Sequence, residues 1–311
     1  MRKILSRLLQ IIVTLVGVSF LTFCLTYLAP GDPVTMLLEA GDTIVSQETI
    51  EQTRHEMGLD RPFLVQYGHW VSHAVHGDMG ISYSAKKPVT DKLMEGFEGT
   101  ILLALAAAVL AVLISFPLGI YAAVHQNRLP DHLLRIISFI SVSMPSFWIG
   151  LILLYVFGLL LGLFPIASSQ VSAEGIVLSA VTLAIYMSSK LMRQIRTVIL
   201  DELHKDYVVG ARARGLTERR ILWRHVLPNA ILPLITILGM SIGWLLGGVA
   251  VIEMVFSWPG IGNMAVRAIL MRDYPLIEGF VLWVAIIYTG INFLVDLSYA
   301  LFDPRLRKEA R

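Results

Sequence analysis

Long apolar stretches separated by short polar segments make up most of the chain. A helix needs about 20 consecutive apolar residues to cross the hydrocarbon core of a bilayer, and six stretches reach about that length. They cover residues 9–29, 100–124, 133–163, 171–191, 229–256 and 276–301. The third is longer than one crossing requires, so we expect it to extend into the membrane interface. The pattern predicts an all-α membrane protein with six transmembrane helices.

The composition agrees with this prediction. Of the 311 residues, 56% are hydrophobic and 15% are charged, and the mean hydropathy is +0.70. Soluble domains are less apolar and carry more charge. The single cysteine, Cys24, leaves no possibility of a disulfide within the chain or of a cysteine-rich metal site.

Basic residues gather in four clusters, at residues 2–7, 128–135, 190–224 and 305–311. If six spans alternate, all four clusters fall on one side of the membrane. The positive-inside rule makes that side cytoplasmic, with both termini on it. Residues 30–99 fall on the other side and hold eleven acidic residues against five basic ones. We therefore expect a cytoplasmic N-terminus and first span (1–29), a small external domain (30–99) and a core of five spans (100–311).

Local signals predict elements within these parts. In the external domain we expect a polar helix near residues 46–57, capped by Ser46, and an amphipathic aromatic helix over residues 63–76. We expect the last external loop between the fifth and sixth stretches, after residues 256–262. Pro117 and Pro145 interrupt otherwise regular apolar helices, which neighbouring helices make tolerable in a membrane.

One basic segment, residues 206–228, carries five arginines between two apolar stretches. Each arginine at the bilayer centre costs a few kcal/mol, so the segment should lie in water. It is too apolar and too regular for a spacer. We expect two short helices broken near Gly215, where glycine supplies the backbone freedom of a turn, and small residues, Ala211 and Ala213, that let the turn sit in a groove of a partner.

Absent motifs limit the possible functions. The sequence contains no phosphate-binding loop of the form GxxxxGK(S/T), no HExxH and no GxSxG. The chain is therefore not expected to bind a nucleotide by itself or to be an enzyme. Ion-coupled transport needs ionisable groups near the bilayer midplane, and Glu253 and Asp296 are the main ones in the spans. Because the spans contain so few ionisable groups, we expect the driving energy for transport to come from a partner.

The basic segment also carries a family resemblance. The frame from Gly215 to Leu227-Pro228, with DY at 206–207 and ARARGL at 211–216, resembles the cytoplasmic loop of ABC importer membrane subunits, in the dipeptide/oligopeptide/nickel permease family. Of the Glu-Ala-Ala that gives this loop its usual name, Ala211 alone is kept. The sequences SMPSFW at 143–148, FSWPGIG at 256–262, RDYP at 272–275 and DPRLR at 303–307 extend the match over nearly the whole chain.

The resemblance implies a type I ABC importer permease fold in the inner membrane of a bacterium. It implies a second, homologous permease subunit, two cytoplasmic ATPase subunits that bind ATP and Mg²⁺, and an external solute-binding protein. No cofactor would be bound by this chain and no nucleic acid would be a partner. The ATPase-coupling loop would be residues 201–228. Its matching residues are Asp206, Tyr207, Ala211, Arg212, Arg214, Gly215, Leu216, Leu227 and Pro228. For any single arginine, contact with solvent or with anionic lipid is an equal alternative.

The cargo follows less directly. VQYG at 65–68, PLGI at 117–120, RLPD at 128–131 and a short turn at 165–175 resemble nickel permeases, so we expect import of nickel or a nickel chelate. Peptide import by the same architecture is the first alternative, and an ion-coupled transporter that works without ATPase subunits is the second.

Two groups of side chains are candidates for contact with the cargo. His69, His73 and His76 share a helix face and could chelate a divalent ion; histidines at the membrane interface or against the binding protein are the alternative. Along the pathway or its gate the candidates are Met144, Ser146, Phe147, Glu253, Met254 and Asp296. Packing is the alternative for the methionines, and structural bracing is the alternative for Glu253.

Overall fold

The computed structural model describes residues 2–29, 34–35, 38 and 46–302, and of residues 2–5, 8, 242–244, 246–248 and 294–302 it describes the backbone alone. These residues form helices joined by loops, with one isolated β-bridge between Ile81 and Pro88. The all-α prediction is confirmed. The chain divides into two compact units: unit 1 comprises Met1–Thr100 and Pro259–Thr289, and unit 2 comprises Ile101–Trp258 and Gly290–Arg311.

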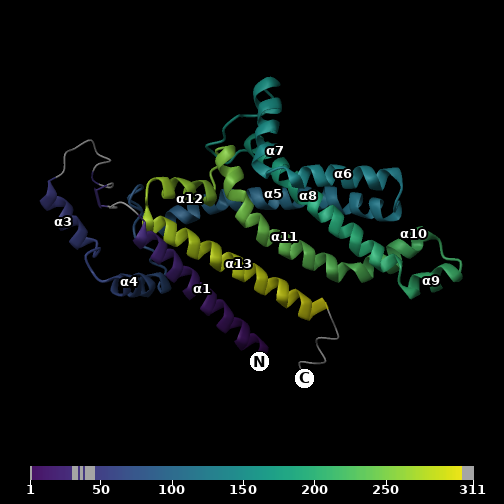
Figure 1. The fold of residues 1–311 in the computed structure, drawn as a ribbon, viewed down its shortest axis with the longest axis horizontal. Coiled ribbons are helices and arrows are strands. Elements are labelled where there is room, and N and C mark those ends of the chain that lie inside the picture. The colour runs from purple at the N-terminus through teal and green to yellow at the C-terminus, as the bar shows by residue number, and fades with distance from the viewer. Residues whose placement is uncertain (1, 30–33, 36–37, 39–45, 303–311) are drawn as a thin grey trace. The chain divides into compact units, whose positions relative to one another are not determined.

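Among the described residues, five helices are long and apolar enough to cross a membrane, or six if one bent pair counts as a single span. Figure 1 shows the helices along the chain. Those of unit 1 are α1 (Arg2–Leu28), α3 (Gln47–Glu56), α4 (Phe63–Val75) and α12 (Ile261–Leu270), together with the first parts of α5 (Val89–Val124) and α13 (Tyr274–Phe302). α3 begins as predicted, because the Ser46 hydroxyl accepts a hydrogen bond of 3.2 Å from the Thr49 N–H.

α12 is a helix that the sequence analysis placed in a loop. It has ten residues, too few for a span, and buries one face, including Ile261, Ala265 and Ala268. Its first N–H, that of Ile261, donates to the Thr100 hydroxyl over 2.9 Å. The helix therefore depends on a partner 161 residues away in sequence, which local signals do not reveal.

Aromatic rings join α1 to α4 in unit 1. Phe20 and Phe23 lie 5.2 and 5.5 Å from the ring of Tyr67, edge to face, an arrangement that adds to the value of burying the rings. The hydroxyl groups of Ser19 and Tyr67 are 3.0 Å apart. The second helix of the predicted external domain is thus packed against the first apolar helix.

A buried carboxylate fixes the loop that precedes α5. Asp273 is fully buried just before α13. It accepts hydrogen bonds from the hydroxyls of Ser82 and Ser84, at 2.6 and 2.7 Å, and from the backbone N–H groups of Tyr83 and Ser84, at 3.0 and 2.9 Å. These bonds hold the loop of residues 80–88 against α13, since a buried carboxylate needs its acceptors satisfied.

Unit 2 is built around α8 (Ala173–Leu203), which contacts α6 (Leu129–Ser143), α7 (Ser146–Leu153) and α11 (Leu227–Val255). In Figure 1 α8 lies between α6 and α11. Its buried residues form the centre of one apolar core that also takes in parts of α5 and α11. Unit 2 further contains α9 (Asp206–Ala213), α10 (Glu218–Ile221) and two π-helical stretches, Leu154–Leu160 and Leu222–Val226.

The predicted third span, residues 133–163, is not one straight helix. α6 and α7 meet at an angle of 99° around Met144 and Pro145. Proline lacks the N–H that would continue the helix and forces the residue before it out of the helical region, and Met144 is extended, with φ −88° and ψ 139°. Pro117, in contrast, lies inside α5 without ending it.

α5 and α8 approach closely at a glycine. A Cβ on Gly119 would lie 2.8 Å from Cγ2 of Ile195 and 2.9 Å from the backbone oxygen of Met192. Small residues at such contacts are what allow helices to pack tightly in a membrane. Gly119 is therefore required by the packing of unit 2.

Candidate functional site

The basic segment of residues 206–228, called the coupling segment below, consists of α9, a turn at Gly215, α10 and a π-helical stretch that runs into α11. The predicted break is confirmed: Gly215 has φ +78°, a left-handed conformation that favours glycine. One expectation is corrected. The second short helix is not separate, because residues from Glu218 to Val255 form one continuous helical run.

The Gly215 turn is closed by backbone and side-chain bonds. The N–H of Gly215 donates to the Arg212 carbonyl over 2.9 Å, as expected where a glycine ends a helix. The Arg212 guanidinium donates to both carboxylate oxygens of Glu218, at 2.7 and 3.1 Å. This bond raises the pKa of Arg212 further above its usual range. Arg212 is therefore engaged within the chain, joining α9 to α10.

One side of the coupling segment belongs to the core of unit 2. Val208, Ala211, Ile221 and Val226 are buried in that core with the residues of α8. This corrects the expectation for Ala211, whose small side chain packs inside its own chain, while Ala213 is exposed. The predicted residues Tyr207, Leu216 and Leu227 pack against the same core.

Tyr207 ties α9 to the end of α8. Its hydroxyl donates to the Glu202 carboxylate over 2.9 Å, and Glu202 is 6% exposed. Burial, and then the bond to Glu202, raise the pKa of Tyr207. Glu202 also pairs with Lys205, the residue before α9. α9 is thus joined to α8 through both apolar and polar contacts.

The other side of the coupling segment is exposed and combines apolar and basic side chains. Val209 and Trp223 are 57% and 60% exposed. A hollow of about 410 Å³ is lined by Thr217, Arg219, Arg220, Trp223 and Arg224. Aromatic residues and arginines are enriched at protein interfaces. The sequence analysis missed Val209 and Trp223; for Val209 the signal was the three-residue spacing of Val208 and Ala211, which turns Val209 away from the core.

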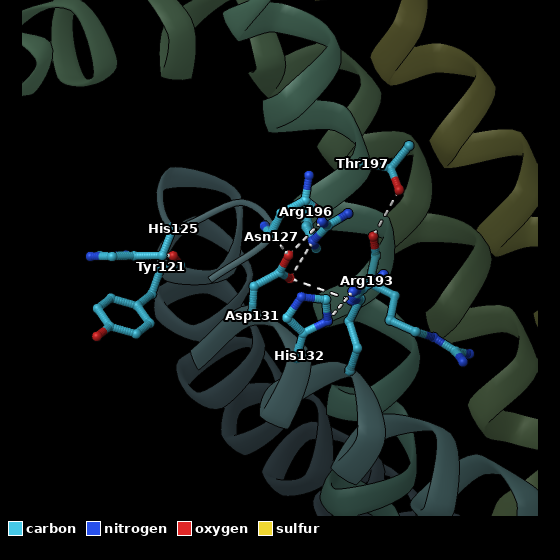
Figure 2. A network of polar contacts seen from close by, with 9 residues as sticks. Tyr121, His125, Asn127, Asp131, His132, Arg193, Arg196 and Thr197 are labelled. Atoms are coloured by element: carbon cyan, nitrogen blue, oxygen red, sulfur yellow. Dashed lines mark hydrogen bonds and ion pairs between the residues drawn. The ribbon is translucent and has the colours of Figure 1, made fainter. Parts of the chain in front are cut away.

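A buried ion pair lies at the first turn of α6 (Figure 2). Asp131, on the first turn of α6, is fully buried and accepts hydrogen bonds from Nε and Nη2 of Arg196 on α8, at 2.6 and 2.7 Å. The N–H of Asn127 donates to the same carboxylate over 2.9 Å, and Arg135 Nε lies 3.6 Å from it. This two-point contact fixes α6 on α8.

The sequence analysis named Asp131 only within a family match and Arg196 only within a basic cluster. Their separation of 65 residues explains why the pairing was missed. Because α8 carries both Arg196 and Glu202, it links α6 to the coupling segment.

The pathway candidates occupy three places in unit 2. Met144, Ser146 and Phe147 lie at the bend between α6 and α7, and Phe147 is exposed. Glu253 and Met254 lie at the end of α11, which contacts α7. Glu253 is fully buried whereas Met254 is exposed, so Glu253 suits bracing better than lining. Asp296 lies on α13, and its side chain is outside those that the structure describes. A role in transport stays a prediction for all six.

The three histidines lie at the end of α4. The rings of His69 and His73 are 4.5 Å apart, centroid to centroid. Nδ1 of His73 lies 3.2 Å from a carboxylate oxygen of Asp78, whose pKa is lowered by the Gly80 N–H and then by His73. His76 Nδ1 is 2.7 Å from the Ser72 carbonyl. The described part of the chain holds no group of three metal-ligating side chains, and metal binding by these histidines stays a prediction.

Comparison with known proteins gives a consistent result. A family model described as "Binding-protein-dependent transport system inner membrane component" matches residues 115–308, and a model for the N-terminal part of such components matches residues 1–104. The chain is 40% identical to the nickel import system permease protein NikB of Staphylococcus aureus, over 98% of this chain and 92% of that protein. It is 38% identical to the glutathione transport system permease protein GsiC of Escherichia coli K12, over 98% of both chains.

Two solved structures share the fold. One is an inward-facing conformation of the MetNI methionine ABC transporter, with a TM-score of 0.57 and 18% identity over 68% of this chain and 96% of that chain. The other is an amino acid ABC transporter with histidines, with a TM-score of 0.52 and 17% identity over 67% of this chain and 92% of that chain.

Proposed function

Since this chain belongs to the family of binding-protein-dependent inner-membrane transport components, it is a permease subunit of an ABC importer, and we propose that its coupling segment is the surface on which a cytoplasmic ATPase subunit docks. Members of this family are multi-pass proteins of the bacterial inner membrane that work with ATPase and solute-binding partners. The chain is the transport component of such a system, not its catalytic part.

The exposed side of the coupling segment carries this proposal. Val209 and Trp223 expose apolar surface in a segment whose arginines keep it out of lipid. The opposite side is anchored by Val208 and Ala211 in the core, so the surface is held in a fixed position. A surface that combines exposed apolar side chains with arginines fits an ATPase groove that has an acidic edge.

The proposed movement starts at this surface. When two ATPase subunits bind ATP and Mg²⁺ and close, α9 moves with them. The Tyr207–Glu202 bond and the core contacts transfer the movement to α8, and the Asp131–Arg196 pair transfers it from α8 to α6. Both α6 and α7 contact α8, so the movement of α8 reaches the two parts of the third span on either side of the bend at Pro145. No cofactor is assigned to this chain itself.

The charge distribution supports the orientation that we propose. The coupling segment and both termini lie in the cytoplasm, and residues 30–99 lie outside, where a solute-binding protein delivers cargo. We propose that a second, homologous permease subunit completes the pathway; such a subunit would cover part of the large apolar side chains that α6 and α7 expose, and lipid would cover the rest.

A pair of matched substitutions tests the docking surface. Val209→Asp places a charge on the exposed side of α9 and should abolish co-purification of an ATPase subunit from native membranes, while the chain stays in the membrane. Val75→Asp makes the same change at a valine that is 78% exposed at the end of α4, and should leave the complex intact. Retention of the ATPase by the Val209→Asp chain would show that docking occurs elsewhere.

We propose that the cargo is nickel or a nickel chelate and that the complex carries it into the cell. The 40% identity to a nickel import permease and the sequence features of residues 65–68 and 165–175 support it. The 38% identity to a glutathione permease supports a small peptide nearly as well. Uptake of radiolabelled nickel and of radiolabelled glutathione by a deletion strain carrying this chain and its partners separates the two cargos. Rescue of glutathione uptake without nickel uptake rejects the nickel proposal.

A further inference from the structure

Unit 1 contains a cavity of about 630 Å³. Its walls come from the end of α1, the turn between α3 and α4, α4 itself and the first turn of α13, all of which belong to one compact unit. Small-molecule sites in proteins have volumes of roughly 300–1,000 Å³ and are mostly apolar with a few polar groups. The cavity has the size of a binding site for a small ligand, and nothing in the coupling mechanism uses it.

The cavity contains one buried carboxylate. Glu278 is 7% exposed, and the Thr26 hydroxyl donates a hydrogen bond of 2.7 Å to its Oε1. Within the described part of the chain no basic side chain forms an ion pair with it. Burial disfavours the ionised carboxylate unless a counter-charge offsets the loss of water. Glu278 is therefore a position at which a cationic ligand gains a partner.

The other charged side chains of the cavity differ from Glu278. Arg54 is paired with Glu51 over 2.9 Å, and Glu56, Arg61 and His69 are exposed to solvent. Their fields are screened by water. Among these charged or ionisable side chains of the cavity, Glu278 is thus the one that is shielded from water.

Five aromatic residues contribute to the wall: Phe23, Tyr27, Trp70, Tyr83 and Tyr274. The ring faces attract cations. Contacts between rings hold them in place: the ring centroids of Phe23 and Trp70 are 6.2 Å apart, and those of Tyr27 and Phe63 are 5.0 Å apart. The Trp70 indole N–H and the Tyr274 hydroxyl, on two residues that line the cavity, are buried and have no hydrogen-bond partner within the described residues.

We propose that this cavity binds the ammonium group of a small organic ligand. The charge lies against the Glu278 carboxylate, and the apolar part of the ligand lies against the aromatic rings. A carboxyl group in a cavity lined by aromatic rings suits an organic ammonium ion. It does not suit a divalent metal, which needs several oxygen or nitrogen ligands, and no group of three such residues is present in the described part of the chain. The proposal is independent of the cargo and of ATPase docking.

Two probes of equal shape test the proposal on the full chain in lipid nanodiscs. By saturation-transfer NMR, 2-phenylethylammonium should bind and 2-phenylethanol should bind at least tenfold more weakly. Glu278→Gln keeps the shape of the side chain and should weaken binding of the ammonium probe at least tenfold. Glu56→Gln is the matched control at an exposed position of the same cavity and should leave the affinity unchanged.

A second variant keeps the test decisive if Glu278→Gln does not fold. Tyr27 is 52% exposed, so Tyr27→Leu should leave the fold intact and still weaken ammonium binding several-fold through loss of a ring face. Equal binding of the alcohol and the ammonium probe shows simple partitioning of an apolar molecule and overturns the proposal. Undiminished ammonium binding by a folded Glu278→Gln chain overturns it as well. Because the assay contains no ATPase, either result leaves the docking proposal untouched.

Discussion

Replacement of Asp131 by asparagine should destabilise unit 2 strongly although the side chain barely changes in size. The carboxylate is fully buried and carries the negative charge that offsets Arg196, whose side chain is 14% exposed, and Arg135, 3.6 Å away. In the Asp131→Asn chain these two guanidinium groups face each other without a counter-charge. One carboxylate oxygen that accepted from Arg196 also becomes an amide donor.

The structure sets the size of the effect. Loss of one partner of a buried ion pair costs about 3–5 kcal/mol, because the other charge stays buried and unpaired. For chains of this length about 1 kcal/mol shifts Tm by roughly 2 °C. We therefore expect Tm to fall by about 6–10 °C. The double change Asp131→Asn with Arg196→Met removes both members of the pair and should recover more than half of that loss, since apolar replacement of a whole pair is nearly neutral.

The assay is thermal unfolding of the purified chain in detergent, followed by the fraction that stays monodisperse after heating. Glu95→Gln is the control: it removes an exposed carboxylate that pairs with Lys92 and Lys87. Exposed pairs contribute about 0–1 kcal/mol, so Tm should change by less than about 2 °C. An Asp131→Asn chain as stable as the control, or a double variant less stable than the single one, would refute the argument that the pair holds α6 to α8.

Two further substitutions test packing and the Asp273 contacts. Gly119→Ala should destabilise unit 2 by about 1–3 kcal/mol because the new methyl group overlaps α8. Its control, Gly17→Ala, has no atom within 4 Å of the new methyl group and should be neutral or stabilising by up to about 1 kcal/mol. Equal Tm values for the two variants would contradict the close approach of α5 and α8. Asp273→Asn should free the loop of residues 80–88 and raise tryptic cleavage after Lys86 about tenfold or more, since charged hydrogen bonds contribute about 1.5–3 kcal/mol. Mass spectrometry measures the cleavage, and the control Asp91→Asn, at an exposed position nearby in sequence, should leave the cleavage rate unchanged.

Much of the fold could be predicted from the sequence because its signals are local. Apolar length located the spans, the Ser46 hydroxyl marked the start of α3, and Gly215 marked the turn between α9 and α10. The same local reasoning identified Pro145 as a breaker but did not give the angle of the bend, because the 99° between α6 and α7 depends on how each packs against α8.

The arrangement of the candidate site was predicted in part, for a similar reason. The resemblance located the coupling segment and its arginines. It did not show that Ala211 packs inward and Val209 outward, since that depends on the position of α9 on the core of unit 2. The pairing of Asp131 with Arg196 and the burial of Glu278 beside Thr26 join residues 65 and 252 positions apart. Contacts at such separations leave no periodic pattern in a single sequence.

ATP-dependent uptake in proteoliposomes is the most direct test of the central claim, that the coupling segment transmits the work of a separate ATPase to this permease. The complex purified with the chain should accumulate its cargo only when ATP is hydrolysed, the Val209→Asp complex should lose that uptake, and the Val75→Asp complex should keep it. Uptake by this chain alone, without ATPase subunits, would contradict the claim.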